Sequence, residues 1–504
     1  MISLNVGALI DGGRPRNKVA VIDFDGEQSR SVTYGALNAL GNGVARALVN
    51  RGFRRGDPVG ILATNSSFYL AIHLGIMRAG LVSVPINFRL PAHLIGDIVK
   101  DCGARLVFCD VQHRALLPDD VGAVRLNKLE EFSSFVDHGP FEAVTPEKGE
   151  PATFLYTSGS TAKPKGVVLS HDAQRWVIDM RLGSPDLGDQ RVLIAAPLYH
   201  MNALALSHLV LAAHASMVLM PRFRVKGYIQ AIDRFRCTWV TAVPPMIAMM
   251  LNDQEAMASA DLSSVRHVRM GSAPASVTLL DKIKRTFPKA EILNAYGTTE
   301  GSPIVFGPHP QRKPIPDLSL GYKHPQVDLR LVDDAGAEAD EGVLQLRSPG
   351  MMSGYHNRSD LPQPFTSDGY YITGDIFSRD ADGFYYFVGR ADDMFVSGGE
   401  NIFPGEVERM LETHPDVLQA CVVSIDDPIK GHKPVAFVRL APGSVTGASE
   451  LKAFALQNGT AYQHPRAIWF LDDFPLTSTN KIDRAALMRR ARSAANTVDR
   501  ASSR

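Results

Sequence analysis

The chain has 504 residues, and its 53 Lys plus Arg balance 53 Asp plus Glu, so the formal net charge is zero. Hydrophobic residues make up 45% and charged residues 21%, which is ordinary for globular proteins and excludes the disordered and fibrous classes. A balanced charge provides no overall field that would attract nucleic acid or an anionic membrane. At about 150 residues per domain, the length predicts about three folding units.

The cysteines and the longest apolar stretches of the sequence indicate where in the cell the protein is expected. The four cysteines include no C-x-x-C pair, so they provide neither a disulfide framework nor a zinc cluster, and a reducing cytoplasm fits them. Residues 1–17 lack the pattern of a secretory signal. The most apolar windows, Leu209–Met220 and Trp239–Leu251, are shorter than the ~20 residues of a membrane-spanning helix. We therefore expect a cytoplasmic protein without a transmembrane segment or a nucleic-acid partner, and leave open whether it is a homodimer.

From about Asp57 to Tyr296, short runs rich in Val, Ile and Leu alternate with longer amphipathic stretches. This alternation is typical of strands that feed helices around buried parallel sheets. The strands predicted in this region are Val59–Ala63, Val82–Ile86, Leu106–Cys109, Val192–Ala196, Met217–Met220, Trp239–Val243 and Val265–Met270.

After about Ser319 the pattern changes to an alternation of period two, which is typical of antiparallel strands with one buried face. Asp-Gly pairs at 368–369 and 382–383 favour the tight turns that such strands need. The expected strands of this barrel-like β unit, at about 319–390, are Asp328–Val332, Leu344–Arg347 and Phe384–Val388.

Beyond Gly389 the sequence predicts a compact α+β tail. Its expected elements are a helix at Pro404–His414, strands at Cys421–Ser424 and Val435–Leu440, and a helix from Glu450. The predicted fold class is therefore α/β, with a large N-terminal domain of parallel α/β sheets and the β unit at 1–391. A small, mobile α+β C-terminal domain follows at 392–504.

A segment rich in hydroxyls and glycine, Thr157 to Gly166, follows the apolar run Ala152–Tyr156. Its N–H and O–H groups can donate to phosphate oxygens, and Lys163 and Lys165 can offset their charge. The chain contains no G-x-x-x-x-G-K-[ST], so the segment is not the loop of the ordinary P-loop NTPases. Taken alone, it fits either a triphosphate cradle or a linker.

Read together with five other segments, this one resembles the superfamily of adenylate-forming enzymes, which comprises acyl-CoA synthetases, peptide-synthetase adenylation domains and beetle luciferases. The likeness covers nearly the whole chain and is greatest to the acid:CoA ligases. The six segments are Tyr156–Gly166, Asn294–Glu300, Tyr371–Asp375, Gly389–Asp393, Ser397–Ile402 and Pro475–Lys481.

The resemblance implies an ATP-dependent ligase that forms acyl-AMP and pyrophosphate, and then acyl-CoA and AMP. A carboxylate is a poor acyl donor, but its adenylate carries AMP as a good leaving group that a thiol can displace. Bringing the acid to ATP needs Mg²⁺, fixed donors and a cation. One alternative is a ligase that loads the phosphopantetheine of a carrier protein. A non-catalytic nucleotide or acyl-adenylate sensor is another, but Glu300, Lys481 and Asp392 are all present.

The resemblance also implies catalytic roles for four residues. Glu300 is the expected Mg²⁺ ligand, and Thr299 is expected to bond the α-phosphate. Lys481 matches a lysine that contacts the substrate carboxylate and the α-phosphate. His200 matches a position near the acyl carbonyl, although the residue by itself fits a core histidine equally well.

The expected nucleotide site comprises more residues. Tyr296 offers a flat face for adenine, segment 271–274 is expected on its other side, and Asp375 and Arg390 match ribose contacts. The full set is Thr157, Ser158, Gly159, Ser160, Thr161, Lys165, Gly271, Ser272, Ala273, Pro274, Asn294, Ala295, Tyr296, Gly297, Thr298, Asp375 and Arg390.

Three further groups of residues complete the expectations. Asp392 matches the hinge between the two domains, and rotation of the small domain about it would serve the two half-reactions in turn. The expected coenzyme A tunnel is lined by Gly398, Gly399 and Glu400. The acyl pocket, which suits a medium-chain or aryl acid, is expected from His200, Met201, Asn202, Met270, Gly301, Ser302 and Phe306. Ala162 and Asn480 stand where the family usually has glycine.

Overall fold

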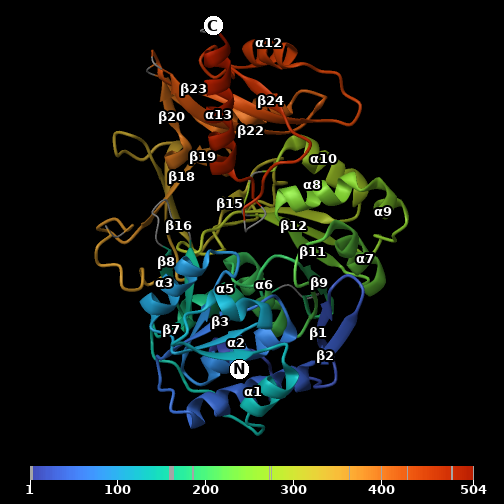
Figure 1. Ribbon diagram of the computed structural model, residues 1–504, viewed down its shortest axis with the longest axis vertical. Coiled ribbons are helices and arrows are strands. Elements are labelled where there is room, and N and C mark those ends of the chain that lie inside the picture. Colours follow the sequence, from blue (N-terminus) through green and yellow to red (C-terminus); the bar gives the residue numbers. More distant parts are fainter. Residues whose placement is uncertain are drawn as a thin grey trace.

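The computed structural model describes residues 4–157, 164–183, 187–271, 273, 275–361, 364–398, 400–427, 429–477 and 481–502. Two mainly parallel sheets form the body of the large domain (Figure 1). The first has the order β6 (Gly122–Arg125), β5 (Leu106–Cys109), β3 (Pro58–Leu62), β4 (Val82–Pro85), β7 (Pro151–Thr157) and β8 (Lys165–Ser170). Only the β7–β8 pair is antiparallel among these described strands.

The second sheet carries the remaining predicted parallel strands. Its order is β13 (Glu291–Ala295), β12 (His267–Gly271), β11 (Trp239–Ala242), β9 (Arg191–Ile194), β10 (Ser216–Leu219), β1 (Val19–Phe24) and β2 (Ser29–Thr33). β1 and β2 pair antiparallel, whereas the other described neighbours are parallel. All seven strands predicted between residues 57 and 296 coincide with observed strands, which confirms the α/β fold class.

Helices pack between and around the two sheets. One core cluster contains side chains of β3, of β9 and of helices α2 and α6, so these two helices lie between the sheets. Serine or threonine caps four of the helices by accepting a backbone N–H, at Thr33, Ser66, Ser170 and Ser276. The helices of the large domain are α1 (Tyr34–Asn50), α2 (Ser67–Arg78), α3 (Ala92–Cys102), α4 (Leu129–Phe135), α5 (His171–Asp179), α6 (Met201–Ala212), α7 (Val225–Phe235), α8 (Pro244–Asn252), α9 (Gln254–Ala258) and α10 (Val277–Thr286). The short 3₁₀ helices are Val6–Ala8, Val111–Leu116 and Leu187–Asp189.

A six-stranded antiparallel sheet forms the predicted β unit. Its order is β14 (Phe306–Gly307), β15 (Gly321–Lys323), β19 (Phe384–Arg390), β18 (Tyr371–Arg379), β17 (Glu341–Arg347) and β16 (Asp328–Val332). The order is open, with β14 and β16 at the edges, so the described strands do not close into a barrel. The unit also begins at Phe306, earlier than the expected 319, because β14 is too short to show an alternation.

The tail follows the 3₁₀ helix η4 (Ala391–Asp393) and has two core clusters of its own. In Figure 1 it occupies one end of the molecule, above α8 and α10. Its elements are β20 (Phe395–Ser397), β21 (Glu400–Ile402), α11 (Pro404–Glu412), β22 (Val417–Asp427), β23 (Gly431–Leu440), α12 (Ala448–Asn458), β24 (Ile468–Phe470) and α13 (Arg484–Ser502). Within the described residues, no helix combines the length and apolar character that crossing a membrane requires.

Candidate active site

Glu300 lies at the tip of a tight loop after β13. Thr298 and Ser302 pair across this loop, and the carboxylate of Glu300 accepts hydrogen bonds from two hydroxyls. Thr157 Oγ1 donates to its Oε1 at 3.4 Å, and the hydroxyl of Tyr355 donates at 3.3 Å. Burial raises the pKa of the Glu300 carboxyl, and the hydrogen bonds from these two donors offset only part of that rise.

Both ends of the predicted phosphate loop lie beside Glu300. Thr157 ends β7 and Lys165 begins β8, and the two residues are paired in the β7–β8 ladder. The ammonium of Lys165 lies 5.4 Å from the ring centroid of Tyr355 and also draws down the pKa of Glu300. The sequence analysis missed Tyr355, because a tyrosine between glycine and histidine carries no spacing that marks it as functional.

Asp375 on β18 bonds two of the other predicted residues. Its Oδ2 accepts from the hydroxyl of Tyr296 and its Oδ1 from Nη1 of Arg390 at 2.8 Å. The antiparallel register places Asp375 opposite Arg390 on β19. Burial raises the pKa of Asp375, and Arg390 is the largest influence that lowers it. Arg390 also donates to the carboxylate of Asp392 at 3.0 Å, so it connects the predicted ribose site to the predicted hinge.

The ring of Tyr296 packs edge-on against Phe377, with ring centroids 4.8 Å apart and planes at 77°. Its hydroxyl is engaged by Asp375, and burial is the main reason that its pKa lies well above the ordinary value. The structure therefore brings Tyr296 to Asp375 of the predicted ribose site, while its stacking on adenine stays a prediction.

Lys481 comes from the tail and lies close to these residues of the large domain. Burial lowers the pKa of its ammonium, the charge of Asp375 raises it, and Arg390 lowers it further. Its backbone pairs with Thr477, whose N–H donates to the carbonyl of Lys481 at 2.7 Å. Lys481 of the tail is thus within electrostatic reach of Asp375 and Arg390 of the large domain.

His200 precedes the first residue of α6. Its Nε2 is buried without a hydrogen-bond partner. Burial, with smaller contributions from Lys481 and Arg89, lowers the pKa of the imidazole to about 3, so the ring is neutral at physiological pH. An orphaned ring nitrogen beside Lys481 favours the predicted place near a substrate over a satisfied core histidine.

Close backbone packing explains two of the predicted glycines. Gly271 at the end of β12 pairs with Ala295 of β13, and a Cβ on Gly271 would lie 2.9 Å from the carbonyl oxygen of Ala295. A Cβ on Gly297 would lie 2.6 Å from Cα of Pro303. The predicted residues Asn294, Ala273 and Thr299 are half-buried beside these segments.

The predicted acyl-pocket residues divide into two groups. Met201 and Asn202 open α6 next to His200, and Ser302 is buried with a φ of 102° just after Gly301. Met270 instead packs in the core on the other face of β12, and Phe306 packs against Phe377 and Tyr385.

The predicted hinge and tunnel residues lie at the start of the tail. Asp392 is exposed within η4. Gly398 and Glu400 are exposed at the β20–β21 turn, and the N–H of Gly398 donates to the carbonyl of Lys430 at 2.9 Å. The described contacts of Gly398 and Glu400 remain within the tail, whereas Lys481 interacts electrostatically with Asp375 and Arg390 of the large domain.

Several predicted positions lie outside the described residues. They are Ser158, Gly159, Ser160, Thr161, Ser272, Pro274 and Gly399, together with the two departures from the family pattern, Ala162 and Asn480.

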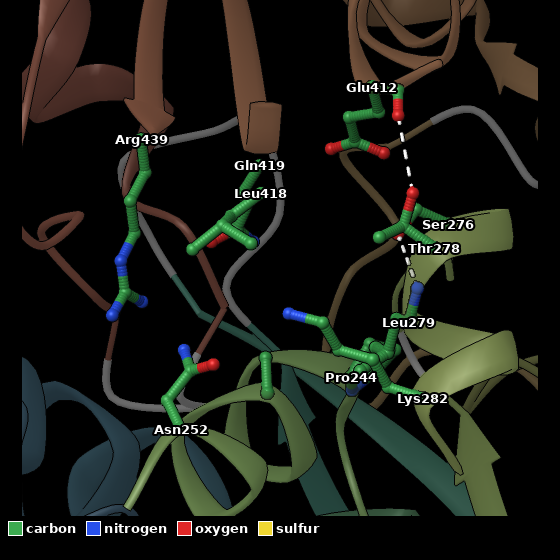
Figure 2. Close-up of a pocket in the computed structure, with 11 residues that line it drawn as sticks. Pro244, Asn252, Ser276, Thr278, Leu279, Lys282, Glu412, Leu418, Gln419 and Arg439 are labelled. Atoms are coloured by element: carbon green, nitrogen blue, oxygen red, sulfur yellow. Dashed lines mark hydrogen bonds between the residues drawn. The ribbon is translucent and has the colours of Figure 1, made fainter. Parts of the chain in front are cut away.

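A separate cavity of about 60 Å³ lies between the large domain and the tail (Figure 2). Lys282 of α10 and Arg439 of β23 point into it from opposite sides. Across the same interface, Oγ1 of Thr278 donates to the backbone carbonyl of Glu412 at 3.3 Å. Its described lining includes none of the predicted site residues.

Comparison with known proteins agrees with this arrangement. A family model described as AMP-binding enzyme matches residues 11–356, and one described as AMP-binding enzyme C-terminal domain matches residues 406–481. A feruloyl-CoA synthase of Amycolatopsis sp. is 31% identical over 473 residues, which cover 91% of this chain and 94% of that protein. A sulfoacetate–CoA ligase of Cupriavidus necator is 30% identical over 494 residues, covering 92% and 94%.

The fold agrees as well. The crystal structure of the anthranilate CoA ligase AuaEII in complex with anthranoyl-AMP superposes with a TM-score of 0.88 at 26% identity, covering 98% of this chain and 99% of that one. The order of the motifs, the two-domain fold and the match of both family models lead to one conclusion: the chain belongs to the AMP-binding, adenylate-forming enzyme family.

Proposed function

We propose that the protein is an ATP-dependent carboxylic acid:CoA ligase that forms acyl-AMP and pyrophosphate and then acyl-CoA and AMP. The observation that carries the proposal is the place of Lys481. A half-buried lysine of the tail lies within electrostatic reach of Asp375, Arg390 and His200 of the large domain, where an acid and ATP would meet. The relatives named above are ligases for different acids that share transfer to CoA.

In the first half-reaction, a carboxylate oxygen of the acid attacks the α-phosphorus of ATP, and pyrophosphate leaves. Both reactants are anionic, so a cation at their meeting point stabilises the transition state. Lys481 supplies that charge, and Asp375 and Arg390 hold the ribose. The neutral His200 can donate one hydrogen bond to the acyl carbonyl oxygen without adding charge.

Mg²⁺ fits the surroundings of Glu300. A half-buried carboxylate among hydroxyl groups offers the hard oxygen that Mg²⁺ prefers, and the ion typically takes one or two carboxylates together with phosphate oxygens. When bound, the ion offsets the charge on the phosphate oxygens.

In the second half-reaction, the thiol of CoA attacks the acyl carbonyl, and AMP leaves. The turn of Gly398 and Glu400 is proposed to line the approach of the thiol after the tail rotates about Asp392. Transfer to a carrier protein is less favoured, since the compared relatives named above are CoA-dependent. The cytoplasm as compartment remains a proposal from the cysteine usage, and a homodimer remains open.

Pyrophosphate release tests the function. Purified protein with ATP and Mg²⁺ is offered aliphatic, cinnamic, benzoic and dicarboxylic acids, followed by CoA or a phosphopantetheinylated carrier protein. We expect acid-dependent pyrophosphate release and acyl-CoA formation, both lost in Lys481→Ala. If the acyl group is transferred only to the carrier protein and not to CoA, the carrier protein is the acceptor and the CoA ligase proposal is wrong. Nucleotide binding without pyrophosphate release for any acid would favour a sensor.

A further inference from the structure

Two arginines reach the predicted acyl pocket from different elements. Arg269 lies on β12, where successive side chains point to opposite faces. Because Met270 packs in the core, Arg269 points to the face on which α6 lies, and its Nη1 donates to Oδ1 of Asn202. Arg181 follows α5, and its Nη2 donates to the carbonyl of Pro303 at 2.9 Å, directly after Ser302.

These guanidinium groups have no anionic partner in the part of the chain that the structure describes. Among the described residues, no carboxylate forms an ion pair with Arg181 or Arg269, and each makes one side-chain hydrogen bond to a neutral oxygen. Burial lowers the pKa of Arg181 to about 9, with a further contribution from the charge of Arg269. Burial alone lowers the pKa of Arg269 to about 10. The two positive charges are therefore half-buried neighbours that no carboxylate of the described residues compensates.

An uncompensated pair of this kind is unusual. Buried charges are normally paired, since removing an ion from water is costly, and arginine remains charged in proteins. Their unbonded nitrogens are not among the buried polar atoms without a partner, so these N–H groups face accessible space. A guanidinium offers five donors in a planar fork that matches a carboxylate or sulfonate.

We propose that the acid substrate carries a second anionic group, a carboxylate or a sulfonate, that binds between Arg181 and Arg269. This inference rests on the proposed ligase function. The reacting carboxylate lies toward Lys481 and His200, and the distal anion lies toward the two arginines. It narrows the expectation of a medium-chain or aryl acid to one with a distal anion, because Arg269 rather than Met270 is the residue of β12 on the face where α6 lies.

Matched acids test the proposal through pyrophosphate release. Each pair has one length and differs at the distal end: succinate and succinamate, glutarate and glutaramate, 3-sulfopropionate and butyrate, terephthalate and 4-methylbenzoate. We expect kcat/KM for at least one dianion to exceed that of its uncharged partner at least about 10²-fold, as for sites built to hydrogen-bond a substrate group. The carboxylate and sulfonate arms identify which anion the pocket takes.

Variants then assign the preference to the two arginines. In Arg181→Gln and Arg269→Gln the ratio of kcat/KM between dianion and uncharged partner should fall at least about tenfold, and Arg269→Lys should retain part of it. The ratio is measured within one preparation, so it does not depend on the folded fraction. Arg266→Gln is the matched control, because Arg266 is exposed and bonds the carbonyl of Ser263.

The outcomes separate the two proposals. If the uncharged partners are turned over equally well or better, the proposal of a second anionic group is overturned and the ligase function stands. The same conclusion follows if the ratio of kcat/KM between dianion and uncharged partner is unchanged in both Arg181→Gln and Arg269→Gln. If no acid of either kind releases pyrophosphate, the ligase function itself is overturned.

Discussion

Glu300 shows how surroundings prepare a side chain for a cation. Its neighbours are the hydroxyls of Thr157 and Tyr355, and burial raises the pKa of its carboxyl. Both features favour a bound positive charge, because an approaching cation stabilises the ionised carboxylate that burial disfavours.

Glu300→Gln keeps the size of the side chain and removes its charge. We expect the Mg²⁺ concentration for half-maximal adenylation to rise at least about tenfold, while metal-free nucleotide binding changes little. Pyrophosphate release over a Mg²⁺ titration, with calorimetry of nucleotide binding, measures both. An unaltered Mg²⁺ dependence would place the metal elsewhere.

Lys481→Ala removes the one tail cation predicted to act in adenylation. We expect adenylation to fall about 10²- to 10³-fold, by analogy with the loss of one preorganised donor, and CoA transfer from supplied acyl-AMP to remain largely intact. The two half-reactions are assayed separately. An equal fall in both would show that Lys481 does not act in one half-reaction alone.

At this scale the sequence predicted residues that belong to motifs and missed those that do not. Glu300, Asp375, Arg390 and Lys481 were identified by their motifs, and the structure brings Asp375, Arg390 and Lys481 together. Tyr355 and the two pocket arginines lie outside any motif. Their positions depend on which face of a strand or loop meets another element, which only the tertiary fold defines.

Among the elements, the strands of the parallel sheets were the most predictable. Their two buried faces produce continuous apolar runs, such as Leu106–Cys109, which coincides with β5. The β unit was less predictable at its edge, since β14 has only two residues and no period to detect. The sequence analysis assigned Met270 of β12 to the acyl pocket, whereas Arg269 is the residue on the face that meets α6. Both faces of β12 are covered, so the alternation of side chains along the strand does not show which face borders the pocket.

The 3₁₀ helix η4 is the element on which the predicted domain rotation depends. It connects β19 to the tail, and Asp392 within it is exposed. A large rotation must change a few backbone dihedrals at such a junction.

Asp392→Pro fixes φ near −65°, and proline is compatible with a first helical turn. We therefore expect adenylate formation to continue and transfer to CoA to slow at least about tenfold. Single-turnover assays that follow acyl-AMP and acyl-CoA separately measure this, with Asp392→Asn as a control for the loss of the Arg390 ion pair. Normal transfer with impaired adenylation would refute the hinge.

At the scale of the whole molecule, the two domains meet around the cavity of Figure 2. Glu412 contributes to its lining, and its Oε1 accepts from the N–H of Ala420 at 3.0 Å. Burial raises the pKa of Glu412 to about 8 from the ordinary 4.5, with Glu408 adding to the rise and Arg409 opposing it.

This shift makes stability depend on pH. The folded protein holds the proton of Glu412 more tightly than the unfolded chain does, so its contribution is fully present below about pH 4.5 and is lost as pH rises to about 8. Glu412→Gln should therefore raise Tm relative to the parent by on the order of 2 °C at pH 8.5, and by less at pH 5.5. Thermal denaturation across this range, with exposed Glu255→Gln as control, tests it. A pH-independent difference would contradict the assignment.

The position of Arg390 between two carboxylates has a consequence for the timing of turnover. One guanidinium bonds Asp375 at the predicted ribose site and Asp392 at the predicted hinge. When ribose hydroxyls donate to Asp375, they compete for its oxygens and leave Arg390 more available to Asp392; when AMP departs, Asp375 reclaims it. We therefore expect the binding and departure of nucleotide to act on the tail through this single shared cation.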